Sequence, residues 1–157
     1  MQSNIPLAER LRPRTLDEYI GQEHLVGPQG VFRKFIETGN VPSFILWGPP
    51  GVGKTTLAKL VATALERKLF TLSAVTSGVK EVREVIEQAR KSQFFNTPSP
   101  FLFIDEIHRF NKSQQDSLLG AVEQGVVTLI GATTENPSFE VISPLLSRCQ
   151  VYVLKAM

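Results

Sequence analysis

Cysteine and histidine are scarce in this sequence, which excludes several kinds of site. The 157 residues include one cysteine, Cys149, and two histidines. A single thiol forms neither an internal disulfide nor a cysteine cluster for zinc, and we expect Cys149 to be a small buried residue instead of a reactive thiol. His24 and His108 lie far apart in the sequence, without the spacing of a metal-binding motif.

Long apolar runs are also missing. No stretch approaches the roughly 20 apolar residues that cross a bilayer, and Met1–Asn4 lacks the basic-then-apolar order of a signal peptide. We therefore expect a cytoplasmic protein. With 42% hydrophobic and 20% charged residues, the composition is that of one ordinary globular domain. The net charge of +2 permits contact with nucleic acid without predicting it.

Short apolar runs alternate with helix-like segments along most of the chain. Five runs have the length and character of strands buried on both faces, namely residues 44–47, 69–73, 101–104, 127–131 and 151–154. Helices are expected over 31–36 before a C-cap at Gly39, over 55–65, 82–89 and 114–123, and from Ser143-Pro144 onward. This alternation predicts an α/β fold with a parallel sheet covered by helices on both faces. We expect Trp47, Phe101 and Phe103 in its core.

The segment Gly48–Thr55 matches the phosphate-binding P-loop, G-x-x-x-x-G-K-[ST]. Its glycines let backbone N–H groups curl around an anion, and the helix that follows adds its positive dipole end. Lys54 places a cation on the β- and γ-phosphates of ATP, and the Thr55 hydroxyl binds Mg²⁺. The predicted nucleotide-binding residues are Gly48, Pro49, Pro50, Gly51, Val52, Gly53, Lys54, Thr55 and Thr56.

An acidic pair follows the third apolar run. Asp105 is expected at the carboxyl end of its strand, where ligands gather in parallel sheets, and can hold Mg²⁺ directly or through water. Glu106 is placed to orient and polarise the water that attacks the γ-phosphate. A small-molecule kinase does not need such a glutamate, so the pair favours hydrolysis. The predicted metal ligands are Thr55 and Asp105, and Lys54 and Glu106 are predicted to be catalytic.

Two further catalytic candidates lie towards the end of the chain. Thr134, with Asn136 as second choice, follows the fourth run and can contact the γ-phosphate or the water; the alternative is an ordinary strand-to-turn transition. Arg148 is expected to point away from its own P-loop and to reach the ATP of an adjacent subunit. The alternative is a surface arginine paired with a nearby acid.

Three other polar residues have open roles. Ser73, at the end of the second run, either hydrogen-bonds Glu106 and holds it inactive or is a plain strand-end serine. His108 and Arg109 either contact DNA or a neighbouring subunit, or are solvated loop residues.

Taken together, these motifs resemble the AAA+ ATPases, and within them the clamp-loader branch. Leu11–Gln22 looks like that branch's opening motif, and Ser147-Arg148-Cys149 looks like its Ser-Arg-Cys motif, whose arginine acts on the neighbouring subunit. The resemblance implies a P-loop NTPase fold with strand order 5-1-4-3-2. It also implies an arm, residues 1–27, that contributes to the adenine pocket of a core domain, residues 28–157. By analogy, the adenine-pocket candidates are Ala8, Arg12, Ile20 and Gly21.

Segments 105–112 and 131–138 are more narrowly similar to the bacterial family of replication-associated recombination protein A, related to eukaryotic Werner-helicase-interacting proteins. That family implies an oligomeric, DNA-stimulated ATPase of the nucleoid. It acts at stalled replication forks, on DNA ends and single-strand gaps, and single-strand-binding protein is a candidate partner. Its members continue into a helical lid and an oligomerisation domain, so we expect this chain to be the N-terminal part of a longer protein.

Two other functions remain open. One is a Holliday-junction branch-migration motor, because such motors share the opening motif and the segment Gly131–Thr134. The other is a non-catalytic nucleotide-binding module of a larger assembly.

Overall fold

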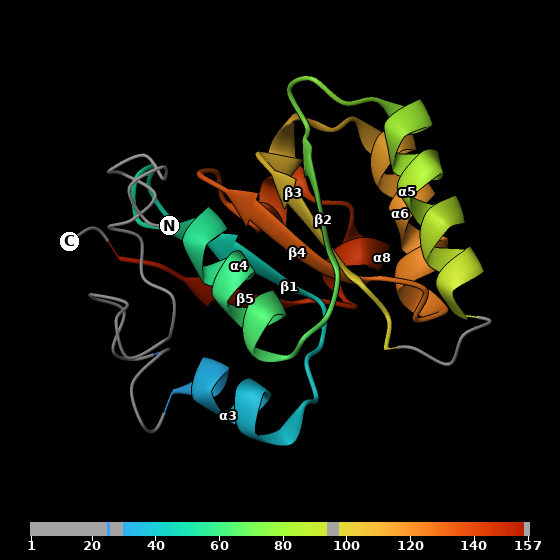
Figure 1. The fold of residues 1–157 in the computed structure, drawn as a ribbon. Coiled ribbons are helices and arrows are strands. Elements are labelled where there is room, and N and C mark those ends of the chain that lie inside the picture. The colour runs from blue at the N-terminus through green and yellow to red at the C-terminus, as the bar shows by residue number, and fades with distance from the viewer. Residues whose placement is uncertain (1–24, 26–29, 94–97, 156–157) are drawn as a thin grey trace, which may run out of the picture.

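The computed structural model describes residues 25, 30–93 and 98–155. Their centre is a five-stranded sheet in the order β2-β3-β4-β1-β5, and every neighbouring pair is parallel (Figure 1). The strands are β1 (Phe44–Trp47), β2 (Leu69–Ser73), β3 (Phe101–Asp105), β4 (Thr128–Thr133) and β5 (Gln150–Val153). Counted from the other edge, this is the order 5-1-4-3-2, and the predicted fold is confirmed.

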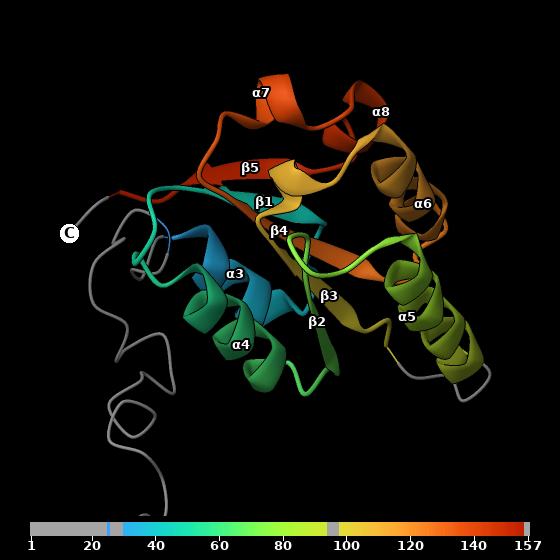
Figure 2. The same ribbon diagram turned by 90° about the horizontal axis from the view of Figure 1, so that it is seen from above.

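Helices cover both faces of the sheet, as Figure 2 shows from above. One face is packed by α3 (Val31–Thr38) and α4 (Lys54–Ala64), and the other by α5 (Val79–Ser92) and α6 (Lys112–Glu123). The short helices α7 (Pro137–Glu140) and α8 (Ser143–Leu146) lie on the side of α6, and Leu145 of α8 belongs to its core cluster. Strand residues alternate between the two cores, because successive side chains point to opposite faces.

The end of α3 shows how local sequence and packing agree. Phe32 and Phe35 lie edge-to-face at 5.4 Å, and both rings pack on Phe44 of β1. Gly39 ends the helix with φ of 75°, where its N–H donates to the carbonyl of Phe35. A residue with a Cβ is disfavoured in this left-handed conformation, which explains the glycine.

Several element boundaries differ from the prediction by one or two residues. Helix α6 begins at Lys112 because Asn111 caps it, in a capping box with Gln114. Strand β4 continues to Thr133, where backbone pairing with β1 persists although the side chains become polar. The sequence pattern missed α7 and the one-turn 3₁₀ helix η4 (Ile107–Arg109).

Phe101 and Phe103 lie in the core as predicted, but Trp47 does not. Trp47 is half-buried and belongs to neither core cluster. It pairs with Val153 of the edge strand, and paired residues of neighbouring strands point to the same face. Val153 is 49% exposed, so the helical cover of this face ends before the edge strand.

None of the helices within the described ranges combines the length and hydropathy needed to cross a bilayer.

Candidate functional site

A cavity of about 400 Å³ opens at the carboxyl edge of the sheet. It is lined by Pro50, Gly51, Gly53, Lys54, Thr55, Thr56, Asp105, Glu106, Thr133 and Thr134. These residues come from three segments: the turn after β1 with the first turn of α4, the end of β3 with Glu106 after it, and the end of β4 with Thr134 after it. The P-loop and the acidic pair, which are about 50 positions apart in the sequence, therefore line one cavity.

The P-loop has the backbone shape that its glycines permit. Gly51 and Gly53 have φ of 81° and 87°, values that residues with a Cβ rarely adopt. Helix α4 begins directly afterwards at Lys54, so its first N–H groups face the cavity end of the loop. Backbone N–H groups and a helix N-terminus together form an anion-binding arrangement, which suits a phosphate group.

Gly48 fixes where the loop begins. A Cβ on this residue would lie 2.7 Å from the carbonyl oxygen of Leu154, just after β5, so no side chain fits here. Its N–H donates to the carbonyl oxygen of Thr133 at 3.1 Å. The start of the P-loop is thus attached to the ends of both strands that flank β1.

The Lys54 ammonium is held along the loop. Its Nζ donates to the carbonyl oxygens of Gly48 at 2.6 Å and Pro49 at 3.2 Å. Burial lowers the pKa of Lys54, and the carboxylates of Asp105 and Glu106 partly offset this by raising it. Lys54, Asp105 and Glu106 all line the cavity, so the cation and the acidic pair share one site.

The acidic pair occupies the position that the sequence predicts. Asp105 ends β3, and Glu106 follows in a left-handed conformation with φ of 54° that caps η4. A non-glycine residue there costs on the order of 1 kcal/mol, and such strain is concentrated at functional sites.

The residues present suit Mg²⁺ bound together with a nucleotide. Thr55 and Asp105 supply a hydroxyl and a carboxylate oxygen to the same cavity. Mg²⁺ typically takes one or two protein oxygens and completes its shell with waters and phosphate oxygens. Within the described ranges no three His, Cys, Asp or Glu side chains gather as a protein-only metal site.

Two adjacent threonines at the end of β4 differ in their exposure. Thr134 is exposed and lines the cavity, in keeping with the predicted role. Thr133 is only 1% exposed, and its hydroxyl is engaged by His108 and by Glu135. Asn136, the second choice, caps α7 by accepting from the Ser138 N–H and is not among the cavity-lining residues.

His108, whose role the sequence left open, does not line the cavity but contacts Thr133, which does. It is half-buried, and its Nδ1 lies 2.8 Å from the Thr133 hydroxyl, whereas Arg109 is exposed. His108 is therefore more than a solvated loop residue. No spacing along the chain indicates this contact, because it depends on β3 and β4 being neighbours in the sheet.

Ser73 does not make the contact with Glu106 that was considered for it. Its hydroxyl accepts from the Val75 N–H at 3.3 Å, and among the described residues no hydrogen bond joins it to Glu106. The candidate adenine residues Ala8, Arg12, Ile20 and Gly21, like His24, lie outside the described residues.

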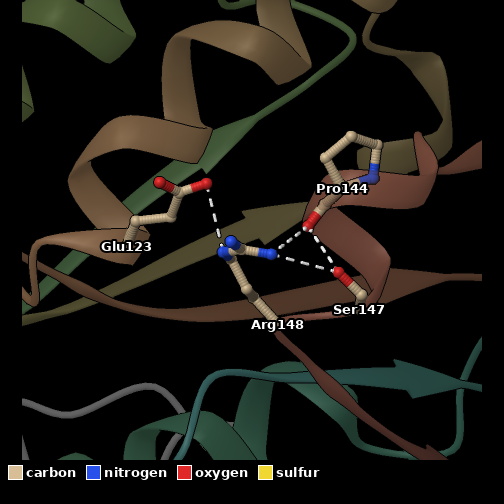
Figure 3. A network of polar contacts seen from close by, with 4 residues as sticks. All are labelled: Glu123, Pro144, Ser147 and Arg148. Carbon is tan, nitrogen blue, oxygen red and sulfur yellow. Dashed lines mark hydrogen bonds and ion pairs between the residues drawn. The ribbon is translucent and has the colours of Figure 1, made fainter.

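Arg148 is not among the residues that line the P-loop cavity, and it pairs with a nearby acid, as the alternative interpretation predicted. Figure 3 shows its guanidinium between α6 and α8, where Nε pairs with Glu123 Oε1 at 3.1 Å. Nη1 donates to the carbonyl oxygen of Pro144 and to the Ser147 hydroxyl. Both charged side chains are more than 40% exposed. Such an exposed pair adds little stability, but together with the Nη1 contacts it orients the guanidinium.

The thiol of Cys149, next to Arg148 in the sequence, has low reactivity. Burial raises the pKa of its thiol to about 11, and the side chain packs against the core on the side of α5 and α6. A thiol with this pKa is almost entirely protonated near neutral pH, which agrees with the predicted structural role.

Comparisons with known proteins agree with this geometry. A family model described as "ATPase family associated with various cellular activities (AAA)" matches residues 44–156. The chain is 55% identical to replication-associated recombination protein A of Escherichia coli K12, over 97% of this chain and 34% of that protein. It is 51% identical to the ATPase WRNIP1 of Dictyostelium discoideum, over 99% of this chain and 18% of that protein.

Solved structures add a likeness of fold. The Thermotoga maritima RuvB Holliday junction branch migration motor superposes with a TM-score of 0.72 at 34% identity. That match covers 93% of this chain and 48% of the RuvB chain. The chain spans about a third of the length of the bacterial relatives it matches.

Proposed function

This chain belongs to the AAA family of ATPases, and on that premise we propose that it binds Mg·ATP in the P-loop cavity and hydrolyses it. The observation that carries the proposal is the convergence of Lys54, Thr55, Asp105, Glu106 and Thr134 on one cavity. Phosphoryl transfer to water requires groups that bind the phosphate anion, a cation, a pair of metal ligands and a carboxylate that can orient the attacking water.

Each side chain has a distinct part in the proposed reaction. Lys54 neutralises the β- and γ-phosphate oxygens, and Thr55 and Asp105 hold the metal ion. Mg²⁺, when bound, supplies charge that stabilises the phosphate oxygens. Glu106 accepts a hydrogen bond from the attacking water and orients it in line with the bond that breaks between the γ-phosphorus and the bridging oxygen. Thr134 contacts the water or the γ-phosphate.

Arg148 completes the set from a second copy of the chain. In its own chain it lies outside the cavity and is oriented by Glu123 and Ser147, so its remaining N–H groups can be presented to a neighbour. An arginine supplied in trans stabilises charge on the transferred phosphoryl group. We therefore propose that hydrolysis takes place in a homo-oligomer.

Substitution of two residues separates hydrolysis from binding. Glu106→Gln is expected to lower phosphate release by about 100-fold or more, the range for loss of a general base, while a fluorescent ATP analogue still binds. Lys54→Ala is expected to lose most of that binding. Glu87→Gln, on the exposed face of α5, is the matched control. Unchanged hydrolysis in Glu106→Gln together with lost binding in Lys54→Ala would identify a non-catalytic nucleotide-binding module.

The proposed biological setting is DNA in replication-associated recombination and repair. It is supported by the identity of 52–55% to replication-associated recombination proteins A of Haemophilus influenzae and Escherichia coli. We propose a cytoplasmic, nucleoid-associated ATPase that acts at stalled forks, on DNA ends or single-strand gaps, with single-strand-binding protein as a candidate partner. Phosphate release measured with forked, gapped and no DNA tests this, and equal rates in all three would contradict it.

A second candidate is a branch-migration motor. The specific observation in its favour is the fold similarity to RuvB over 93% of this chain at 34% identity. ATP-dependent dissociation of a synthetic Holliday junction, without comparable stimulation by forked DNA, would favour this alternative.

A further inference from the structure

Three segments of the candidate site meet at one buried residue. The Thr133 carbonyl oxygen accepts from the P-loop through the Gly48 N–H at 3.1 Å. The Thr133 hydroxyl lies 2.8 Å from His108 Nδ1, in the turn after Glu106, and accepts from the Glu135 N–H at 3.0 Å. Thr133 therefore contacts the phosphate loop, the turn of the acidic pair and the turn that carries Thr134.

The hydrogen bonds around the Thr133 hydroxyl indicate which atom donates. If its single proton is directed to the carbonyl oxygen of Glu135 at 3.2 Å, its oxygen accepts from the Glu135 N–H and can accept one more hydrogen bond. A hydroxyl oxygen can accept two hydrogen bonds but donates only one. All three contacts are satisfied together when His108 carries its proton on Nδ1 and donates it to Thr133.

The turn that His108 holds is the one that sets Glu106. Glu106 has its left-handed backbone, and the Arg109 N–H closes the turn on the Glu106 carbonyl oxygen at 2.8 Å. Ile107 packs on Gly131 of β4 so closely that a Cβ there would lie 3.2 Å from the Ile107 side chain. Two consecutive side chains, Ile107 and His108, thus attach this turn to β4, the first by packing and the second by a directed hydrogen bond.

We propose that His108 and Thr133 form a positioning junction that fixes the Glu106 carboxylate relative to Thr134. This inference rests on the proposed hydrolytic function of the cavity. Neither residue needs to touch the nucleotide for this role. Because the junction sets the direction of the water-orienting group, its loss lowers kcat and leaves nucleotide affinity nearly unchanged. A displacement of about 1 Å in a catalytic group can cost on the order of 100-fold in rate.

A double-mutant cycle tests the junction through phosphate release at saturating ATP. His108→Ala and Thr133→Val are each expected to lower kcat by about 10-fold or more, with the dissociation constant of a fluorescent ADP analogue unchanged within about twofold. The double variant is expected to be no slower than the slower single variant, because both remove the same bond. His108→Asn keeps a donor near the position of Nδ1, and Thr133→Ser keeps the hydroxyl, so both should recover most of the rate.

Controls separate positioning from general damage. Thr38→Val removes a hydroxyl at the far end of α3, whose hydrogen bonds with described residues are to Lys34 and Asn40, and should not change kcat. Circular dichroism identifies variants that fail to fold. If the effects of the two single variants multiply in the double variant, or if His108→Asn is as slow as His108→Ala, the proposed junction is wrong.

A spectroscopic readout tests the junction even where a variant is unstable. In protein with ¹⁵N-labelled histidine, the His108 ring is expected to carry its proton on Nδ1, and its signals should shift in Thr133→Val. The missing signal in His108→Asn assigns the resonance. Signals unaffected by Thr133→Val overturn the inference, because the bond joins Nδ1 to the Thr133 hydroxyl in either tautomer of the ring. Absence of nucleotide binding in the unmodified chain would instead refute the proposed function, and the ring spectrum still tests the junction.

Discussion

Replacing Gly48 by alanine tests how closely the P-loop packs against the end of the last strand. The added Cβ would lie 2.7 Å from the Leu154 carbonyl oxygen and 2.9 Å from the Leu154 Cβ. Both distances are shorter than contacts seen in folded proteins, and backbone atoms cannot rotate away as a long side chain can. Overpacking of this kind costs about 1–3 kcal/mol. We expect a value near the upper end, since either the loop or the segment after β5 has to move.

Two other glycines serve as matched controls for the same chemical change. Gly51 has open space around it but φ of 81°, so Gly51→Ala is expected to cost about 1–2 kcal/mol through backbone strain alone. Gly120 lies within α6, where an added Cβ meets nothing within 4 Å. Gly120→Ala should therefore stabilise the chain by about 0.5–1 kcal/mol, because alanine favours a helix over glycine.

Urea unfolding followed by circular dichroism measures all three changes on one scale. The midpoint urea concentration is expected to be highest for Gly120→Ala, followed by the unmodified chain, then Gly51→Ala, and lowest for Gly48→Ala. The m values should be unchanged. For a domain of this size, 1 kcal/mol shifts the melting temperature by about 2–4 °C. A Gly48→Ala chain as stable as the unmodified one would refute the close packing of the P-loop on the segment after β5.

Two remaining predictions concern the chemistry of Cys149 and the start of α6. With its pKa raised from 9.0 to about 11 by burial, the Cys149 thiol should react with iodoacetamide at pH 8 on the order of 100-fold more slowly than a free thiol of pKa 9.0. Because the folded thiol holds its proton more tightly than the unfolded thiol, the folded state is favoured below pH 9, and this stabilisation is lost as the pH rises from 9 to about 11. Urea unfolding measured across that pH range would detect the loss. Asn111→Ala removes the side-chain acceptor for the Gln114 N–H and should lower the free energy of unfolding by about 1 kcal/mol, whereas Asn111→Ser should retain most of it.

The strands and the phosphate loop could be predicted because their signals are local. Leu102 and Ile104 point to one core and Phe101 and Phe103 to the other, so a strand buried on both faces is apolar at every position. The P-loop is similarly local, since glycines, a lysine and a hydroxyl must follow one another closely to enclose phosphates. Strand order came from the family resemblance, because the apolar pattern of a run does not specify its neighbours.

What the sequence could not indicate depends on contacts across the sheet. The link from His108 to Thr133 exists only because β3 lies next to β4, and the incomplete burial of Trp47 follows from its pairing with the edge strand β5. The identity of Asn111 as a cap depended on the conformation of the turn before it, which lengthened α6 by two residues. Local patterns predict elements well, but the environment at the end of a strand depends on its partners.

The strand order itself explains why chemistry gathers at one edge of this chain. Because β4 lies between β1 and β3, the turns that follow these three strands are adjacent at the carboxyl edge. The first turn carries the P-loop, the second presents Asp105 and Glu106, and the third presents Thr134, so the groups proposed to hold phosphate, metal ion and water line one cavity. Arg148 follows α8 instead, outside that cavity, and pairs with Glu123. The fold thus separates the residues proposed to bind ATP and orient water from the cation proposed to complete the transition state. On this proposal, hydrolysis depends on contact between two chains.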